Sequence, residues 1–149
     1  MDKIPTICRK EPVNDSFYFL RQKKRDCKCN AESMYTGEYF KKCLLYAKHI
    51  KPQKIYILSA KYGLLSLDEK ISPYEQTLIN KTKRERKKWA LMVYKQMINK
   101  HIDFNDTAVF LGGGIYREYI IRLFKNAKVP FQGMGIITQM GEINKVIKG

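Results

Sequence analysis

Residues 55–75 read IYILSAKYGLLSLDEKISPYE, and this stretch decides the fold. It opens with a run of apolar, β-forming residues and changes character at Ser59, where small and polar residues begin. α/β proteins place ligands where a buried strand runs into such a loop, because the loop holds side chains and free backbone N–H groups over a rigid sheet. The stretch therefore predicts a strand followed by a ligand-handling loop.

Length and composition predict one folded domain that spans residues 1–149. Apolar residues make up 44% of the chain and aromatic residues 12%, which favours a packed core over disorder. The formal net charge of +15 favours a polyanionic partner, above all nucleic acid. The alternative is that a lysine-rich composition only keeps the protein in solution.

The sequence predicts a cytoplasmic protein with no membrane partner. No stretch approaches the roughly 20 apolar residues of a membrane span. The first 15 residues, MDKIPTICRKEPVND, lack the apolar centre of a signal peptide. In the cytoplasm the four cysteines would be reduced thiols.

Strand and helix patterns alternate along the chain. Strands are predicted at residues 17–20, 55–58, 107–111 and 129–131. Helices are predicted after Thr36, over 83–101, from Ile115 onward and over 139–147. This order predicts an α/β protein: a single three-layer domain with a small, mostly parallel sheet of about four strands flanked by helices.

Three glycines, Gly112, Gly113 and Gly114, follow the strand over 107–111 and precede a helix. Such a junction lets the backbone approach a ligand closely. The pattern is neither G-x-G-x-x-G nor a P-loop. Because the carboxyl ends of parallel strands meet at one edge of a sheet, we expect the glycines to form the floor of a pocket beside the Ser59 loop.

The loop after Ser59 carries side chains suited to a nucleobase. Tyr62 and Tyr74 could stack on a base, and Lys61 could hold a phosphate or a carbonyl group. Asp68 or Glu75 could activate water or stabilise an oxocarbenium-like centre if a glycosidic bond is broken. The alternative is that these residues have structural roles: Tyr62 lies in a turn, residues 64–65 are buried in the core, and Tyr74 packs where the chain changes direction.

Two clusters of basic residues are candidates for phosphate contact. One lies in the loop after the first predicted strand, and the other begins the helix over 83–101. Cations at a helix N-terminus oppose the helix dipole, so their presence there suggests another use, although a solvated helix face is the plainer alternative. The residues are Lys23, Lys24, Arg25, Lys83, Arg84, Lys87 and Lys88.

The cysteines give little support for a metal site. Cys27 and Cys29, with Cys8 and a histidine, could bind zinc in principle, but C-x-C is not the usual C-x₂-C spacing and no second such pair exists. Cys43 lies on the apolar face of a helix and is predicted to be core. We expect no metal and no cofactor.

The segment LSAKYGLLSLDEKISPYE resembles the signature of the YaaA peroxide-stress family, which has Leu-Ser-x-x-Tyr-Gly-Leu-Leu followed by Pro-x-Asp and Ile-x-Pro-Tyr. Small YaaA-like domains of bacteria and their viruses are more similar still, over residues 17–141. This chain departs from them at residues 20–24, where a Cys- or Ser-rich turn is usual, and at Leu67, where proline is frequent. The further matching residues are Ala31, Met34, Tyr35, Gly37, Phe40, Gly113, Tyr116, Gly133 and Gly135.

The resemblance implies a nucleic-acid or nucleobase partner, since YaaA-like proteins are associated with DNA binding and oxidative DNA damage. A more distant similarity links them to a domain of archaeosine synthases, which act on a modified base in tRNA. The prediction is a nucleic-acid-associated protein, with DNA favoured over RNA, that handles a base or nucleoside in a pocket. The expected substrate-binding residues are Tyr35, Lys61, Gly63, Tyr74, Gly112, Gly113 and Tyr116.

Whether the pocket is catalytic stays open at the level of sequence. An enzyme would be a metal-independent glycosidase or transferase that cleaves or exchanges an N-glycosidic bond, because such sites need stacking and a carboxylate. One alternative is a non-catalytic DNA-binding protein of stress response or phage interaction, and another is a small-metabolite enzyme with incidental basicity. The candidate catalytic residues are Ser59, Tyr62, Asp68 and Glu75.

Overall fold

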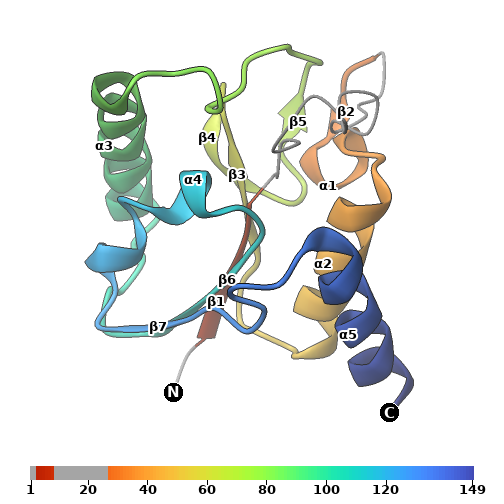
Figure 1. Cartoon of the computed structure of the whole chain (residues 1–149). Coiled ribbons are helices and arrows are strands. Elements are labelled where there is room, and N and C mark those ends of the chain that lie inside the picture. Colours follow the sequence, from red (N-terminus) through yellow and green to blue (C-terminus); the bar gives the residue numbers. More distant parts are fainter. Residues whose placement is uncertain (1–2, 9–26) are drawn as a thin grey trace.

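The computed structural model describes residues 3–8, as backbone, and residues 27–149. Its main feature is a five-stranded sheet in the order β4-β3-β1-β6-β7 (Figure 1). β1, β3, β6 and β7 run parallel, and β4 runs antiparallel to β3. The strands are β1 (Lys3–Cys8), β3 (Tyr56–Ser59), β4 (Gly63–Ser66), β6 (Thr107–Leu111) and β7 (Asn126–Lys128).

Helices and a short two-stranded ribbon complete the described part of the chain. The ribbon pairs β2 (Cys29–Asn30) with β5 (Lys70–Ile71) in antiparallel fashion. In Figure 1, α3 lies on one side of the strands, and α2 and α5 lie together on the other. The helices are α1 (Ala31–Met34), α2 (Glu38–His49), α3 (Lys83–Asn99), α4 (Gly114–Arg117), the 3₁₀ turn η2 (Ile121–Leu123) and α5 (Ile136–Lys148).

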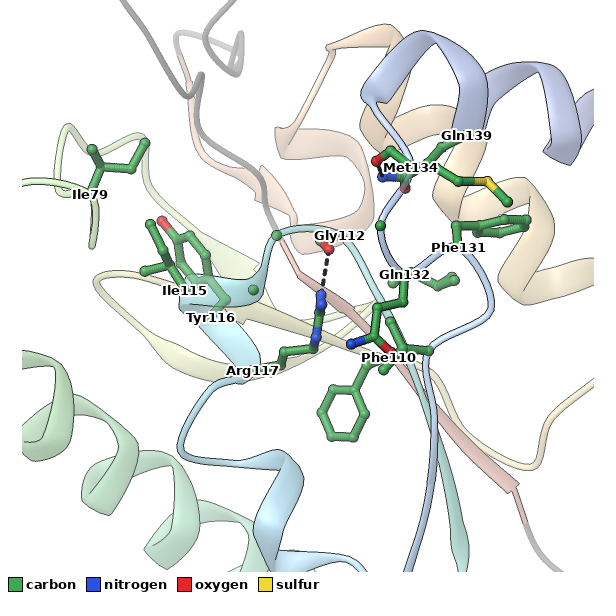
Figure 2. A pocket seen from close by; sticks show the side chains of 15 residues that line it. Ile79, Phe110, Gly112, Ile115, Tyr116, Arg117, Phe131, Gln132, Met134 and Gln139 are labelled. Atoms are coloured by element: carbon green, nitrogen blue, oxygen red, sulfur yellow. Dashed lines mark hydrogen bonds between the residues drawn. The ribbon is translucent and has the colours of Figure 1, made fainter.

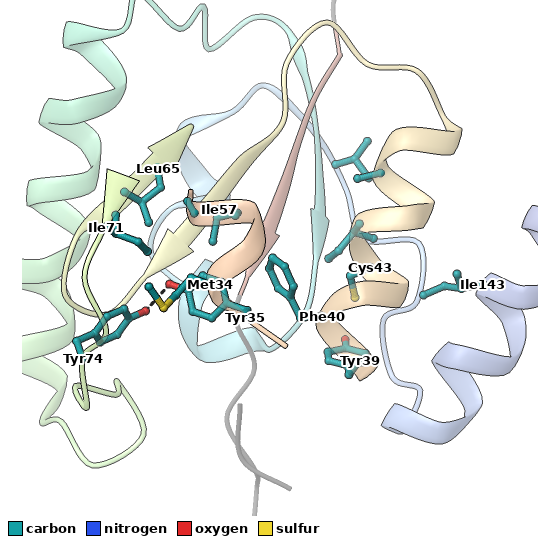
Figure 3. Packing of buried hydrophobic residues seen from close by; sticks show 14 residues of the cluster. Met34, Tyr35, Tyr39, Phe40, Cys43, Ile57, Leu65, Ile71, Tyr74 and Ile143 are labelled. Atoms are coloured by element: carbon teal, nitrogen blue, oxygen red, sulfur yellow. Dashed lines mark hydrogen bonds between the residues drawn. The ribbon is translucent and has the colours of Figure 1, made fainter. Parts of the chain in front are cut away.

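The buried residues form two clusters, and alternate residues of the strands belong to different clusters. Leu58 of β3 is buried in one cluster with Val93 of α3. Its neighbour Ile57 is buried in the other, with Phe40 of α2 and Ile143 of α5 (Figure 3). Because successive side chains of a strand point to opposite faces, the run of apolar residues in β3 serves both clusters. The predicted α/β class is therefore confirmed.

Several predicted elements are present with shifted ends. β3 and β6 are the strands predicted at 55–58 and 107–111, and α3 and α5 are the helices predicted at 83–101 and 139–147. α2 begins after Gly37 rather than Thr36. The buried face of α3 consists of Trp89, Ala90, Val93 and Met97, whereas Leu91 and Ile98 are 51% and 47% exposed.

Two predicted elements are wrong. The strand expected at 129–131 is β7, at Asn126–Lys128, where Ala127 is paired with Ala108 of β6. The long helix expected from Ile115 breaks into α4 and η2. Its buried residues at i, i+4 and i+8, Tyr116, Ile120 and Phe124, do share one cluster. The chain must nevertheless become extended by residue 126 to pair with β6, and that requirement overrides the helical pattern.

The strand at the centre of the sheet was not predicted. The strand expected at 17–20 lies outside the described residues, and the strand between β3 and β6 is β1. Ile7 of β1 pairs with Ile57 on one side and with Leu111 on the other. β1 contains Pro5, which lacks a backbone N–H and is typically excluded from central strands. Its sequence therefore gave no strand signal.

Candidate functional site

The stretch 55–75 forms a tight β-hairpin rather than a strand with an open loop. β3 ends at Ser59, which pairs with Gly63 at the start of β4. The Ser59 hydroxyl oxygen accepts hydrogen bonds from the backbone N–H groups of Lys61 (3.3 Å) and Tyr62 (3.0 Å). Gly63 has φ +73°, a left-handed conformation that glycine adopts without strain. Ser59 thus closes the turn, and residues 64–65 belong to β4.

Gln96 of α3 clamps this hairpin from the side. Its amide nitrogen donates to the carbonyl of Tyr62 at 2.9 Å, and its amide oxygen accepts from Leu64 N–H at 2.8 Å. A Cβ atom on Gly63 would collide with the Gln96 amide and lie 2.8 Å from the Met92 methyl group. The glycine is therefore required both for its backbone conformation and for the close approach of α3.

Three of the predicted site residues meet in the interior through their hydroxyl groups. Ser59 Oγ donates to Tyr74 Oη at 2.9 Å. Tyr74 Oη in turn lies 2.5 Å from Tyr35 Oη, and Figure 3 shows these two tyrosines. Ser59, Tyr74 and Tyr35 are 0%, 5% and 1% exposed. A base cannot stack on Tyr35 or Tyr74 in this arrangement, because both rings are covered by protein.

Tyr62 and Lys61 lie nearer the surface. The Tyr62 ring meets Tyr74 edge-on at 5.7 Å, and its hydroxyl donates to the carbonyl of Ser72 and accepts from the Ser72 N–H. Lys61 is exposed, with its ammonium 5.2 Å from the centre of the Tyr62 ring. Tyr62 thus fastens the segment after β5 to the hairpin.

The two candidate carboxylates, Asp68 and Glu75, are solvent-exposed. The carboxylate that is held in place is their neighbour Glu69, which accepts from Lys100 Nζ at 2.8 Å and from Ser66 N–H at 3.0 Å. Partial burial alone would raise the pKa of Glu69, but these hydrogen bonds and the charge of Lys100 outweigh it and lower the pKa. Glu69 therefore fastens β4 to the end of α3.

A pocket of about 360 Å³ opens at the carboxyl ends of β6 and β7 (Figure 2). One wall is the turn from β6 into α4, formed by Gly112, Gly113 and Gly114, the last of which begins α4. The facing wall is the β7–α5 connection, residues 129–134, which includes Phe131. The pocket includes three predicted substrate-binding residues, Gly112, Gly113 and Tyr116, at the strand ends where α/β proteins bind ligands.

The expected common cavity does not form from the described side chains. Ser59, Tyr62 and Tyr74 do not line the pocket that contains Gly113. The physical reason is that the Ser59 and Tyr74 hydroxyl groups are bonded to each other in the interior, while the Tyr62 hydroxyl is bonded to the backbone of Ser72. Trp89 links the hairpin to the pocket region. Its indole N–H donates to the Ser59 carbonyl at 2.9 Å.

Two polar side chains of the pocket, from α4 and α5, are held in place by hydrogen bonds. The Arg117 guanidinium donates to the carbonyl of Gly112 at 2.8 Å, which holds it against the glycine turn (Figure 2). Gln139 is buried between Tyr39 Oη, which donates to it at 2.6 Å, and the carbonyl of Met134, to which it donates at 2.8 Å. Among the described lining residues Arg117 is the single charged side chain.

Behind the pocket, Phe131 packs against Tyr46 of α2 at a ring distance of 5.0 Å, in an edge-on arrangement. Burial raises the pKa of Tyr46, so its phenol stays neutral to higher pH than an exposed one. The aromatic wall is therefore uncharged and supported from α2.

Basic side chains project from the start of α3. Lys83, Arg84, Lys87 and Lys88 are exposed, and together with Leu91 they line a shallow groove of about 530 Å³. The helix tolerates these cations because it starts with a capping box, in which Thr82 Oγ1 accepts from Glu85 N–H and Glu85 Oε2 accepts from Thr82 N–H. The other predicted basic residues, Lys23, Lys24 and Arg25, lie outside the described residues.

α3 also shapes the rim of the pocket. Arg86 donates to the carbonyls of Leu78 at 2.9 Å and Ile79 at 2.8 Å, and Ile79 lines the pocket. The Trp89 ring meets Tyr116, another lining residue, edge-on at 5.7 Å. The helix with the basic groove is thus joined directly to the pocket.

Residues 21–145 match a protein-family model described as "Family of unknown function (DUF6884)". The chain belongs to this family. No curated protein matches the chain. The part of the chain that matches the DUF6884 model contains the hairpin, the α3 groove and every described residue of the pocket, whereas β1 precedes it.

Within this DUF6884 chain the cysteines are free thiols where their side chains are described. Cys43 is buried in the core, as predicted, while Cys27 is exposed and Cys29 half-buried. Over the described residues no three histidine, cysteine, aspartate or glutamate side chains cluster as metal ligands would. The side chain of Cys8 lies outside the described part. No described helix has the length and apolar character that crossing a bilayer requires.

The sequence reading missed Arg117, Phe131 and Gln132 as pocket residues of this DUF6884 protein. Arg117 fell within the long helix predicted from Ile115 onward, although its position three residues after Gly114 was a usable signal. Phe131 fell within the strand predicted at 129–131, and Gln132 directly follows that range. Their role depends on β7 ending at Lys128, which leaves residues 129–134 free to form a wall of the pocket.

Proposed function

We propose that this protein binds nucleic acid along the start of α3 and holds one unpaired base or nucleoside in the pocket at Gly112–114. The supporting observation is the contact between Arg86 and Ile79, at 2.8 Å. It joins the helix that carries Lys83, Arg84, Lys87 and Lys88 to the rim of the pocket. One strand of nucleic acid could therefore meet both.

Charge supports the first half of the proposal. The formal net charge is +15, and the four cations of the groove are exposed on one helix. Next to the groove, the centre of the Tyr119 ring lies 5.8 Å from Lys87 Nζ and 5.5 Å from the Arg122 guanidinium carbon. Lysine and arginine that neutralise phosphates release condensed counterions, which gives salt-dependent affinity.

The shape and lining of the pocket support the second half. Its volume of about 360 Å³ lies at the small end of the range for ligand sites, about 300–1,000 Å³. Phe131 and Met134 supply an apolar wall, and two glycine-containing turns let the ligand approach the backbone. A flat base fits such a slot, and base–aromatic stacking contributes about 1–3 kcal/mol per base.

The geometry supports binding better than cleavage of an N-glycosidic bond. A glycosidase needs a carboxylate at the reacting carbon. The described lining residues include none, and Asp68 and Glu75 are exposed elsewhere on the chain. We therefore carry forward a non-catalytic nucleic-acid-binding protein, with DNA favoured over RNA.

The proposal keeps three further expectations from the sequence. It treats residues 1–149 as one three-layer domain, which the two buried clusters on alternate strand faces support. It places the protein in the cytoplasm. It also keeps the YaaA-like resemblance, whose signature residues hold the hairpin and line part of the pocket.

The groove is tested by fluorescence anisotropy with labelled single-stranded DNA, duplex DNA and RNA over a range of salt concentrations. The variant K83Q/R84Q/K87Q/K88Q should bind at least about tenfold more weakly, with a shallower salt dependence, because each lost phosphate contact lowers the slope by about 0.7–0.9. The control K41Q/K54Q/K128Q/K148Q removes the same charge from other exposed positions. Equal losses in both variants, or no salt-sensitive binding at all, would refute the groove.

The pocket is tested by NMR, with free nucleosides added to isotope-labelled protein. The amide signals of Gly112, Gly113 and Gly114 should shift on titration, together with the indole signal of Trp89, which contacts Tyr116. Shifts confined to the hairpin residues Lys61 and Tyr62, or no shifts, would refute the pocket as the base site.

A further inference from the structure

The guanidinium of Arg117 is placed and oriented inside the pocket. α4 carries it, and its bond to the carbonyl of Gly112, at 2.8 Å, holds it beside the glycine turn (Figure 2). A guanidinium fixed in this way loses little conformational freedom when it binds an anion.

The hydrogen bond to Gly112 uses only part of the donor capacity of this guanidinium. Arginine has five N–H donors in a planar fork, and among the described residues the Gly112 carbonyl is its hydrogen-bond acceptor. A Cβ atom on Gly114 would lie 3.8 Å from Nη2. The absence of a side chain at Gly114 leaves that side of the fork accessible to a ligand oxygen. The planar fork matches a phosphate with two parallel N–H···O bonds.

The charge of the described pocket lining matches one phosphate group. Arg117 is its single cation, and no carboxylate accompanies it. Di- and triphosphates are usually held by several cationic groups and by Mg²⁺, which proteins bind through carboxylates. The lining offers neither, so longer phosphate chains would be poorly neutralised there.

The side of the pocket opposite Arg117 is suited to the base. Phe131 and Met134 come from the β7–α5 connection and are among the residues that line the pocket (Figure 2). Phe131 is braced by Tyr46, which fixes the ring before a ligand arrives. A ligand with a flat apolar end and one anionic end would satisfy both walls at once.

We infer that the pocket selects a nucleotide unit with a single phosphate group, which Arg117 binds while the base lies against Phe131 and Met134. This inference rests on the proposed function, since it names the chemical form of the base-bearing ligand. It adds a metal-independent phosphate site at Arg117.

Calorimetric titration with adenosine, AMP, ATP and ribose 5-phosphate, in the presence of EDTA, tests the inference. The wild-type protein should bind AMP at least about tenfold more tightly than each of the other three. R117Q should reduce AMP affinity to that of adenosine. R117K should keep part of the preference, because lysine keeps the charge but loses the planar fork. K125Q is the control, since it removes one exposed charge outside the pocket lining.

The outcomes separate this inference from the proposed function. If adenosine binds as tightly as AMP, or if K125Q weakens AMP as much as R117Q does, the phosphate site is refuted and the base pocket stands. If ribose 5-phosphate binds as tightly as AMP, the base is not recognised and the nucleotide assignment fails. If none of the base-bearing ligands binds, the proposed pocket function fails with it. Thermal melting of R117Q and R117K checks that both variants fold.

Discussion

The hydroxyl group of Ser59 donates a hydrogen bond to the hydroxyl of Tyr74 across 2.9 Å, and both side chains are buried. The same Ser59 oxygen accepts from the N–H groups of Lys61 and Tyr62. Its bonding capacity is therefore used within the fold. The signature residues of the stretch 55–75 hold the hairpin to the segment after β5, and the open pocket lies at the carboxyl ends of β6 and β7.

We predict that Ser59→Ala lowers the free energy of unfolding by about 1–3 kcal/mol, because two backbone N–H groups lose their acceptor and the Tyr74 hydroxyl loses one of its hydrogen bonds. Urea denaturation monitored by tryptophan fluorescence measures the change. Ser72→Ala is the control, since that side chain is exposed and the Ser72 contacts with Tyr62 use its backbone; it should stay within about 0.5 kcal/mol. Wild-type stability in Ser59→Ala would contradict the structural role.

We predict opposite effects for alanine at two glycines. Gly63→Ala should destabilise the protein by more than about 1 kcal/mol, because φ is +73° and the new methyl group would collide with the Gln96 amide. Gly141→Ala should stabilise it by up to about 1 kcal/mol, because the residue lies inside α5 with open space around its Cβ position. Thermal melting of both variants is the measurement, and a shift of the same sign in both would contradict the prediction.

The sequence predicted those elements whose local signals agree with their tertiary role. β3 and β6 are apolar runs in an α/β order, and α3 has a threonine cap before a helical pattern. β1 was missed because Pro5 contradicts a central strand locally. The pairing of Ala127 with Ala108 depends on residues distant in sequence, so the end of the helix after Gly114 could not be read from periodicity.

The site was predicted in part for the same reason. The glycine turn was recognisable because Gly112–114 directly follow a strand. The tyrosines carry polar groups, so sequence alone suggested an exposed role. In the fold the hydroxyl groups of two of them form a hydrogen bond with each other: Tyr35 Oη lies 2.5 Å from Tyr74 Oη. Such mutual pairing depends on a contact between residues 39 positions apart, which no local pattern contains.

We predict that Thr82→Ala destabilises the protein by about 1 kcal/mol, because it removes the side-chain acceptor for Glu85 N–H at a helix end crowded with cations. Thr82→Ser keeps a hydroxyl at the cap and should stay within about 0.5 kcal/mol of the wild type. Chemical denaturation measures both. Equal stability of Thr82→Ala and Thr82→Ser would show that the cap contributes nothing.

We predict that the contact between Glu69 and Lys100 stabilises the fold above about pH 5 and loses its effect in acid. The pKa of Glu69 is lowered in the folded protein, because the hydrogen bonds from Lys100 and Ser66 and the charge of Lys100 outweigh partial burial. A carboxyl group whose pKa is lowered on folding contributes its full stabilisation above the unfolded-state pKa, about 4.3 for glutamate. That stabilisation decreases as the pH falls through the folded-state pKa.

The measurement is the free energy of unfolding of the wild type, Glu69→Gln, Lys100→Gln and the double variant between pH 3 and pH 7. The coupling between the two residues should be positive and below about 1 kcal/mol near pH 7, because both side chains are about a third exposed and screened by solvent. It should approach zero at the acid end, since a protonated Glu69 no longer attracts the Lys100 ammonium. A coupling that is independent of pH, or that grows in acid, would contradict the ion pair as its source.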